Sequence, residues 1–171
     1  MELFLRLLLA HMLGDFVFQS AGLVDLKRRS IKGIIVHSGV VSFWTLALVW
    51  NYPYGWAIGL LLSAMHFTID WARCYWRYHR ALEELGFFLG DQFLHFGTIM
   101  GTMAAFGVFI PWEEFKHPAD MAWPLKLMLA LILFILLIWV VPLLEKMVVE
   151  ISPSCSHSRR QIKVDPVQRF A

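Results

Sequence analysis

The chain has 171 residues, of which 58% are hydrophobic and only 16% are charged, and its formal net charge is +2. A soluble domain of this length could not bury so much apolar surface, so the composition indicates a protein that has lipid as its solvent. The small net charge gives no reason to expect a nucleic-acid partner.

Five apolar segments approach the roughly 20 residues that a transmembrane helix needs. They predict an all-α, polytopic membrane bundle of five transmembrane helices, which forms one domain over residues 1–150. A polar, basic tail over residues 151–171 follows it. In chain order, the predicted spans cover about residues 3–21, 33–50, 56–72, 85–110 and 124–144.

The first predicted span carries His11, Asp15 and Gln19, which recur at i, i+4 and i+8 and therefore share one helix face. The burial of such polar groups in the hydrocarbon of a bilayer costs free energy, so we expect them to serve a function. A cleaved signal peptide is the alternative. Glu2 and Arg6 stand where a signal peptide has a basic cluster, and no A-x-A site follows, which favours a retained helix.

Three later spans carry polar residues at the same helical spacing. The first and third predicted spans run in one direction and read His-x-x-x-Asp, whereas the fourth runs back and reads Asp-x-x-x-His. Folding the chain through the bilayer therefore brings all these groups into one layer, and the fifth span adds none. The residues are His37 in the second span, His66 and Asp70 in the third, and Asp91, Gln92 and His95 in the fourth.

The connections between the spans predict the orientation. Basic residues gather in the first and third connections and in the tail, whereas the second connection has none and the fourth has only Lys116. By the positive-inside rule, we expect the N-terminus outside and the C-terminus in the cytoplasm. The basic residues of the first and third connections are Lys27, Arg28, Arg29, Lys32, Arg73, Arg77 and Arg80.

The polar layer predicts a metal site in the cytoplasmic half of the bilayer. Helix bundles build metal centres from His and carboxylate side chains on facing helices, and these ligands suit a divalent Zn, Fe or Mn ion. The set is large enough for one ion with an outer shell of aspartates, or for two ions. A proton or ion pathway, polar packing and haem ligation are the alternatives. The predicted metal ligands are His11, Asp15, His37, His66, Asp70, Asp91 and His95.

Three classes of function fit such a layer. The first is a membrane-embedded, metal-dependent hydrolase that acts on a lipid-linked or headgroup substrate, because a bound metal activates water. In it, Asp15 or Asp91 would serve as general base, and Gln19 and Gln92 would orient the substrate or bond across helices. The others are a proton- or ion-coupled transport component, and a structural subunit that meets a second copy or another membrane protein through its fifth span. Membrane lipid is the expected partner in each case.

Four pieces of the sequence carry a family resemblance: HMLGDFVFQS in the first span, VHSG in the second, HFTID in the third and DQFLH in the fourth. Together they resemble a bacterial membrane family known only as domain of unknown function 3307, over about residues 3–107. The resemblance implies an integral protein of the bacterial inner membrane with a polar core, and no established reaction. The matching positions are His11, Gly14, Asp15, Gln19, His37, His66, Asp70, Asp91, Gln92 and His95.

Overall fold

The computed structural model describes residues 1–75, 81–109 and 120–151, and within these ranges it contains helices and no strand, which confirms the all-α prediction. Arg77, Arg80, Lys116 and the predicted tail beyond residue 151 lie outside the described residues. The elements are α1 (Glu2–Met12), the π-helical turn η1 (Leu13–Val17), α2 (Ala21–Arg29), α3 (Ile31–Val49), α4 (Gly55–Tyr75), α5 (Ala81–Ala105), α7 (Trp123–Ile135), the π-helical turn η3 (Leu136–Val140) and α8 (Val141–Ile151).

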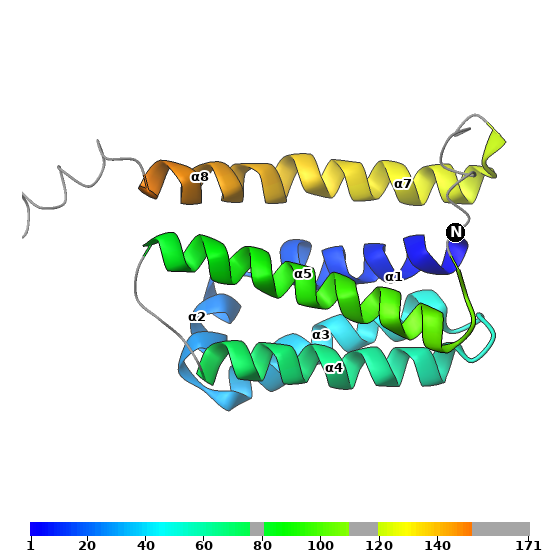
Figure 1. Ribbon diagram of the computed structural model, residues 1–171, viewed down its shortest axis with the longest axis horizontal. Helices are drawn as coiled ribbons and strands as arrows, with labels where there is room; N and C mark the ends of the chain where they lie inside the picture. Colours follow the sequence, from blue (N-terminus) through cyan, green and yellow to red (C-terminus); the bar gives the residue numbers. More distant parts are fainter. Residues whose placement is uncertain (76–80, 110–119, 152–171) are drawn as a thin grey trace, which may run out of the picture.

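The long helices lie side by side along the long axis of the molecule (Figure 1). Helices α1, α3, α4, α5 and the rod formed by α7, η3 and α8 run along this axis, and the chain reverses direction from each to the next. Helix α1 lies at the centre, in contact with α3, α5 and α7. Because it has neighbours on several sides, its apolar residues are buried all round rather than along one stripe: Leu3, Phe4, Leu5, Leu7, Leu9, Ala10 and Met12.

Within the described ranges, two helices are long and apolar enough to cross a membrane: Ile31–Val49 and Trp123–Val149. The number of candidate spans rises to three if the helical segment Glu2–Val17 and helix α2 are counted together as one span, although the two are bent by 88° at the break between them. Length and composition therefore support a membrane protein with two or three spans, and they do not support five. Helices α4 and α5 have 21 and 25 residues, enough length to span, but they carry several of the polar layer residues, which lower their hydropathy.

The first predicted span ends earlier than the sequence suggested. The helix stops at Val17, and Gln19 lies in the break before α2, so the prediction that Gln19 continues the helical stripe is wrong. Much of the predicted first connection is helix α2, because the Oγ atom of Ser20 accepts a hydrogen bond from the backbone N–H of Leu23 at 3.3 Å and caps it. The other predicted spans differ from their helices mainly at the ends.

Gly14 brings the π-helical turn η1 against α3. A Cβ atom added at Gly14 would lie 2.6 Å from Cγ2 and 3.0 Å from Cα of Val41, closer than side chains tolerate. Glycine therefore permits a contact that a larger residue would push apart. Asp15 follows directly in the same turn, so this contact sets how far the carboxylate of Asp15 extends towards α3 and α4.

Candidate metal centre

The structure brings the seven predicted ligands into one buried cluster, and each residue is between 0% and 8% exposed. They come from α1 and η1, α3, α4 and α5, the four segments that the sequence predicted. Three groups among them have ligand atoms within 4.8 Å of one another and could hold a metal ion. The groups are His11, Asp15 and His66; His37, His66 and Asp70; and Asp70, Asp91 and His95.

Four atoms lie close to one another at the middle of the cluster, and we call them the central quartet: Nε2 of His37, Nε2 of His66, Oδ1 of Asp15 and Oδ2 of Asp70. The two nitrogen atoms are 3.2 Å apart. Nε2 of His37 lies 3.3 Å from the Asp15 oxygen and 3.2 Å from the Asp70 oxygen. The corresponding separations from Nε2 of His66 are 3.5 and 3.4 Å.

These five separations, each of which involves an imidazole nitrogen, are close to the edge length of a tetrahedral coordination shell. A Zn²⁺ ion with metal–ligand bonds of about 2.0–2.1 Å holds its ligand atoms about 3.3–3.4 Å apart. Direct N–H···O hydrogen bonds are usually shorter, about 2.9–3.0 Å. Oδ1 of Asp15 is buried and has no hydrogen-bond partner among the described residues, although both imidazoles lie close to it. A cation among the four atoms would satisfy this oxygen.

Gln19 fixes the tautomer of His37. With its side-chain amide oriented to satisfy both ends, its carbonyl oxygen accepts from Nδ1 of His37 at 3.2 Å and from Nζ of Lys27 at 3.1 Å. Its NH₂ group donates to the backbone carbonyl of Asp15 at 3.0 Å. Because the proton of His37 is then on Nδ1, the lone pair on Nε2 faces the other three atoms of the central quartet, as metal ligation requires.

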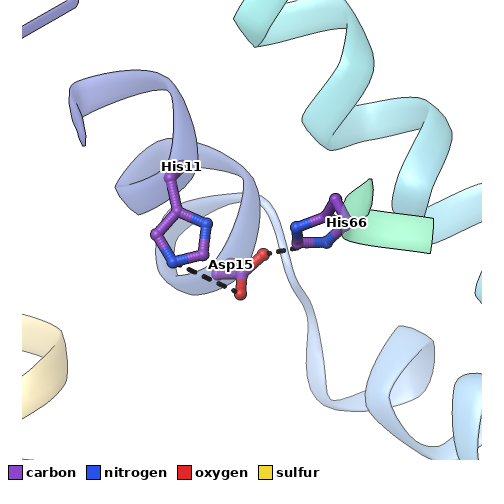
Figure 2. A group of neighbouring side chains, drawn as sticks. All are labelled: His11, Asp15 and His66. Atoms are coloured by element: carbon purple, nitrogen blue, oxygen red, sulfur yellow. Dashed lines mark ion pairs between the residues drawn. The ribbon is translucent and has the colours of Figure 1, made fainter. Parts of the chain in front are cut away.

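His11 and His66 flank the carboxylate of Asp15 (Figure 2). Nε2 of His11 lies 3.8 Å from Oδ2 of Asp15, so the two carboxylate oxygens face different imidazoles. A small cavity of about 20 Å³ lies beside His11, His66 and His95. A water molecule needs about 10–15 Å³ measured in this way, so there is room for one water-sized occupant.

The third group leaves two buried atoms without a hydrogen-bond partner among the described residues: Oδ1 of Asp91 and Nε2 of His95. Nδ1 of His95 lies 2.8 Å from the backbone carbonyl of Asp91 and donates to it, which leaves the lone pair on Nε2. Buried polar atoms are nearly always satisfied in proteins. Two such atoms one helical turn apart are therefore what a second ion or a water molecule would complete.

Two basic residues that the sequence assigned to connections belong to the cluster. Nζ of Lys27 lies 3.0 Å from Oδ1 and 3.1 Å from Oδ2 of Asp70, and Lys27 is only 8% exposed. Arg73 donates from a terminal guanidinium nitrogen to Oδ2 of Asp91 at 2.7 Å. Sequence reasoning missed these pairs because it did not recognise α2, although Ser20 and Ser30, both good N-cap residues, bracket that helix.

Gln92 joins the cluster to a larger cavity. Its Oε1 atom lies 3.3 Å from Nε2 of His11, and its amide nitrogen donates to Oδ2 of Asp91 at the limiting distance of 3.5 Å. The cavity has a volume of about 220 Å³, and Asp15, Gln19 and Gln92 are among its lining residues. Both glutamines thus bond across helices and also line this cavity, so each is placed for both of the roles predicted for it.

Residues 3–123 match the family described as protein of unknown function DUF3307. The match runs from α1 to the first residue of α7 and includes all seven predicted ligands, which confirms the resemblance read from the sequence. The rest of α7, η3 and α8 lie beyond it. No curated protein and no solved structure matches the chain.

Proposed function

The chain belongs to the DUF3307 family, whose function is unknown, and we propose from its geometry that it is a membrane-embedded protein that binds a divalent transition metal. The observation that carries the proposal is the central quartet, whose two nitrogen and two oxygen atoms lie 3.2–3.5 Å apart wherever an imidazole nitrogen is one of the pair. His37, His66, Asp15 and Asp70 would hold one Zn, Fe or Mn ion.

The same geometry favours a metal over the other interpretations of the polar layer. A haem with two axial histidines would need its macrocycle between the rings, but the four imidazoles pack with ring centroids 4.3–5.9 Å apart. A proton pathway would need titratable groups beyond the cluster, towards the N-terminal end of α1. In that direction the buried polar residues that the structure describes are Thr45 and Thr102, and the titratable pair Arg6 and Glu2 lies apart from them at the end of the bundle, where Arg6 also bonds to Asn51.

Hydrolysis is the reaction that such a centre supports best. A bound divalent metal supplies an activated water and a Lewis acid. Asp91 has a buried oxygen without a hydrogen-bond partner in the described chain, which suits a general base. Gln19 and Gln92 line the cavity next to Asp15, where their amides would orient a substrate. The substrate that we propose is a lipid-linked or headgroup compound, because the cavity is lined by apolar as well as basic side chains.

Metal analysis tests this proposal directly. Protein purified in detergent without added metal is expected to contain about one divalent transition-metal ion per chain, or two if Asp91 and His95 hold a second. Chelated protein should regain the same amount on addition of Zn²⁺, Fe²⁺ or Mn²⁺. If purified protein carries no stoichiometric metal and none binds on addition, both the metal centre and the hydrolase are excluded.

We also propose that α1, α3, α4, α5 and the α7–α8 rod all cross the membrane, with the N-terminus outside, in the inner membrane of a bacterium. In support, these segments alternate in direction, and the basic residues Lys27, Arg28, Arg29 and Arg73 belong to the end of the bundle where α2 lies across it. The α7–α8 rod exposes an apolar face that includes Leu133, Phe134, Leu137 and Ile138. Its expected contacts are membrane lipid, a second copy or a membrane partner.

Cysteine labelling checks this orientation. In a variant without native cysteines, Tyr54→Cys lies between α3 and α4, and Arg28→Cys lies on α2. We expect a membrane-impermeant maleimide to label Tyr54→Cys in intact cells, and to label Arg28→Cys only after the cells are opened. Labelling of Arg28→Cys in intact cells, with Tyr54→Cys protected, would reverse the orientation.

A further inference from the structure

The cavity of about 220 Å³ lies next to the cluster, at the end of the bundle where α2, the end of α4, the start of α5 and α8 come together. Asp15 belongs both to its lining and to the central quartet. The volume far exceeds the roughly 10–15 Å³ that one water molecule needs. Arg28, Phe87 and Leu143 of its lining are exposed, so the cavity is open to its surroundings.

One side of the cavity is basic. Lys27, Arg28 and Arg73 all line it. Lys27 and Arg73 are each bonded to a carboxylate of the cluster, whereas Arg28 is exposed and pairs with no carboxylate among the described residues. An arginine guanidinium presents parallel N–H groups that match the oxygen atoms of a phosphate group. Arg28 is therefore the residue with donors to spare for an anionic ligand.

The other side of the cavity is apolar. Phe16 and Phe88 are buried in the protein, while Phe87 and Leu143 are exposed at the edge, and Met147 of α8 completes this side. These residues come from η1, α5 and α8, so the apolar side continues into the lipid-facing surface of the bundle. A ligand with an anionic head and a hydrocarbon chain would match both sides of the cavity at once.

We propose that this cavity binds a phosphate ester, with Arg28 as its principal anchor and the apolar side available to a hydrocarbon chain. The inference rests on the proposed metal centre and names the class of ligand that the centre acts on. The cavity and the proposed metal centre are also connected by two basic residues that line the cavity and bond to predicted metal ligands. Lys27 and Arg73 are bonded to Asp70 and Asp91, two predicted metal ligands.

This shared bonding couples the two sites. A divalent cation on Asp70 and Asp91 would weaken the hold of these carboxylates on Lys27 and Arg73, and would leave both basic groups freer to face an anion in the cavity. A phosphate that draws Lys27 and Arg73 towards the cavity would in turn free the carboxylates for the metal. Because coupling between two binding sites is reciprocal, a phosphate ester is expected to tighten metal binding.

The test measures Zn²⁺ affinity of the full chain in lipid nanodiscs, with chelator-buffered Zn²⁺. One sample contains phosphatidylcholine alone, a second contains phosphatidic acid as well, and a third contains phosphatidylcholine with inorganic phosphate in solution. We expect phosphatidic acid to lower the Kd for Zn²⁺ about tenfold, which lies within the usual range of coupling. Tightening by inorganic phosphate as well would mean that the phosphate group suffices. Tightening by phosphatidic acid alone would mean that the chain is also bound.

Two neighbouring arginines provide a matched pair of variants. Arg28 lines the cavity, whereas Arg29 is ion-paired with Asp25 at 2.9 Å and is not part of the lining. Arg28→Gln is expected to reduce the effect of phosphatidic acid to less than about twofold, and Arg29→Gln, with the same loss of charge, should retain it. Equal effects of the two variants would indicate a general surface attraction and would overturn the proposal.

The outcomes also separate this inference from the metal centre. If Zn²⁺ binds in phosphatidylcholine and neither phosphate source changes its Kd, the phosphate site is wrong and the metal centre stands. If Zn²⁺ binds in none of the samples, the metal centre fails, and the phosphate site that rests on it fails too.

Discussion

The His66→Ala variant is expected to lose nearly all of the metal that the central quartet binds. Nε2 of His66 lies within 3.2–3.5 Å of the other three atoms of the central quartet, and His66 belongs to two of the three groups that could hold an ion. Four-ligand structural zinc sites bind with about 10–16 kcal/mol, which averages about 2.5–4 kcal/mol per ligand. Loss of one ligand should therefore weaken binding by about 70- to 900-fold.

Thr68→Ala is the matched control for this prediction. Thr68 lies on the same helix, is exposed, and donates its hydroxyl hydrogen to the backbone carbonyl of Ala64 at 2.8 Å. Both variants shorten a side chain of α4, but Thr68 makes no contact with the cluster. Elemental analysis and Zn²⁺ titration of both proteins provide the measurement. Full metal content in His66→Ala would contradict the central quartet as a ligand set.

Asp91→Asn distinguishes one ion from two. Asp91 is absent from the central quartet, and its Oδ2 atom already accepts from Arg73 at 2.7 Å. If the centre holds a single ion in the quartet, this variant should keep it. If Asp91 and His95 complete a second site with Asp70, the metal content should fall from two ions per chain to one. The same elemental analysis separates the two results.

The polar layer was predictable from the sequence because helical periodicity and chain reversal together determine depth. His-x-x-x-Asp in one direction and Asp-x-x-x-His in the other bring their side chains to one level whatever the packing of the helices. The seven candidate ligands followed from this reasoning, and they are buried together. The pattern could not tell which four atoms lie nearest one another, since that depends on the rotation of each helix about its axis.

The predictions that failed, for the end of the first span and for Gln19, concern the segment between the first and second long helices. Apolar composition favoured one continuous span through residue 21, but the helix ends after a π-helical turn, and Ser20 begins α2 at a sharp bend. The break places Gln19 within hydrogen-bond distance of His37, and α2 places Lys27 within hydrogen-bond distance of Asp70. A count of basic residues treats Lys27 only as a marker of topology, so it could not anticipate a buried ion pair.

The Gly33→Ala variant is expected to be less stable than the wild type, whereas Gly39→Ala on the same helix is not. A Cβ atom at Gly33 would overlap the backbone carbonyl group of Leu26 and the backbone nitrogen of Lys27, at the end of α2. Backbone atoms cannot turn aside as a flexible side chain can, so α2 would have to shift away from α3. At Gly39 an added Cβ would meet no atom within 4 Å.

The expected magnitudes are well separated. Overpacking of this kind lowers the free energy of unfolding by about 1–3 kcal/mol or more, which corresponds to a fall in Tm of roughly 3–10 °C for a chain of this size. Gly39→Ala should leave Tm unchanged or raise it by a few degrees, because alanine favours a helix over glycine by about 1 kcal/mol. Thermal unfolding of both proteins in the same detergent measures the difference.

The same pair of variants links the fold to the metal centre. A shift of α2 moves Lys27, whose Nζ atom bonds to both oxygens of Asp70 and lies 3.1 Å from the Gln19 oxygen that fixes His37. Residues that orient metal ligands typically change metal affinity about 10–100-fold when altered. Gly33→Ala should therefore weaken Zn²⁺ binding within this range, while Gly39→Ala should not change it. If both variants bind Zn²⁺ and unfold alike, the close approach of α2 to α3 does not hold the centre in place.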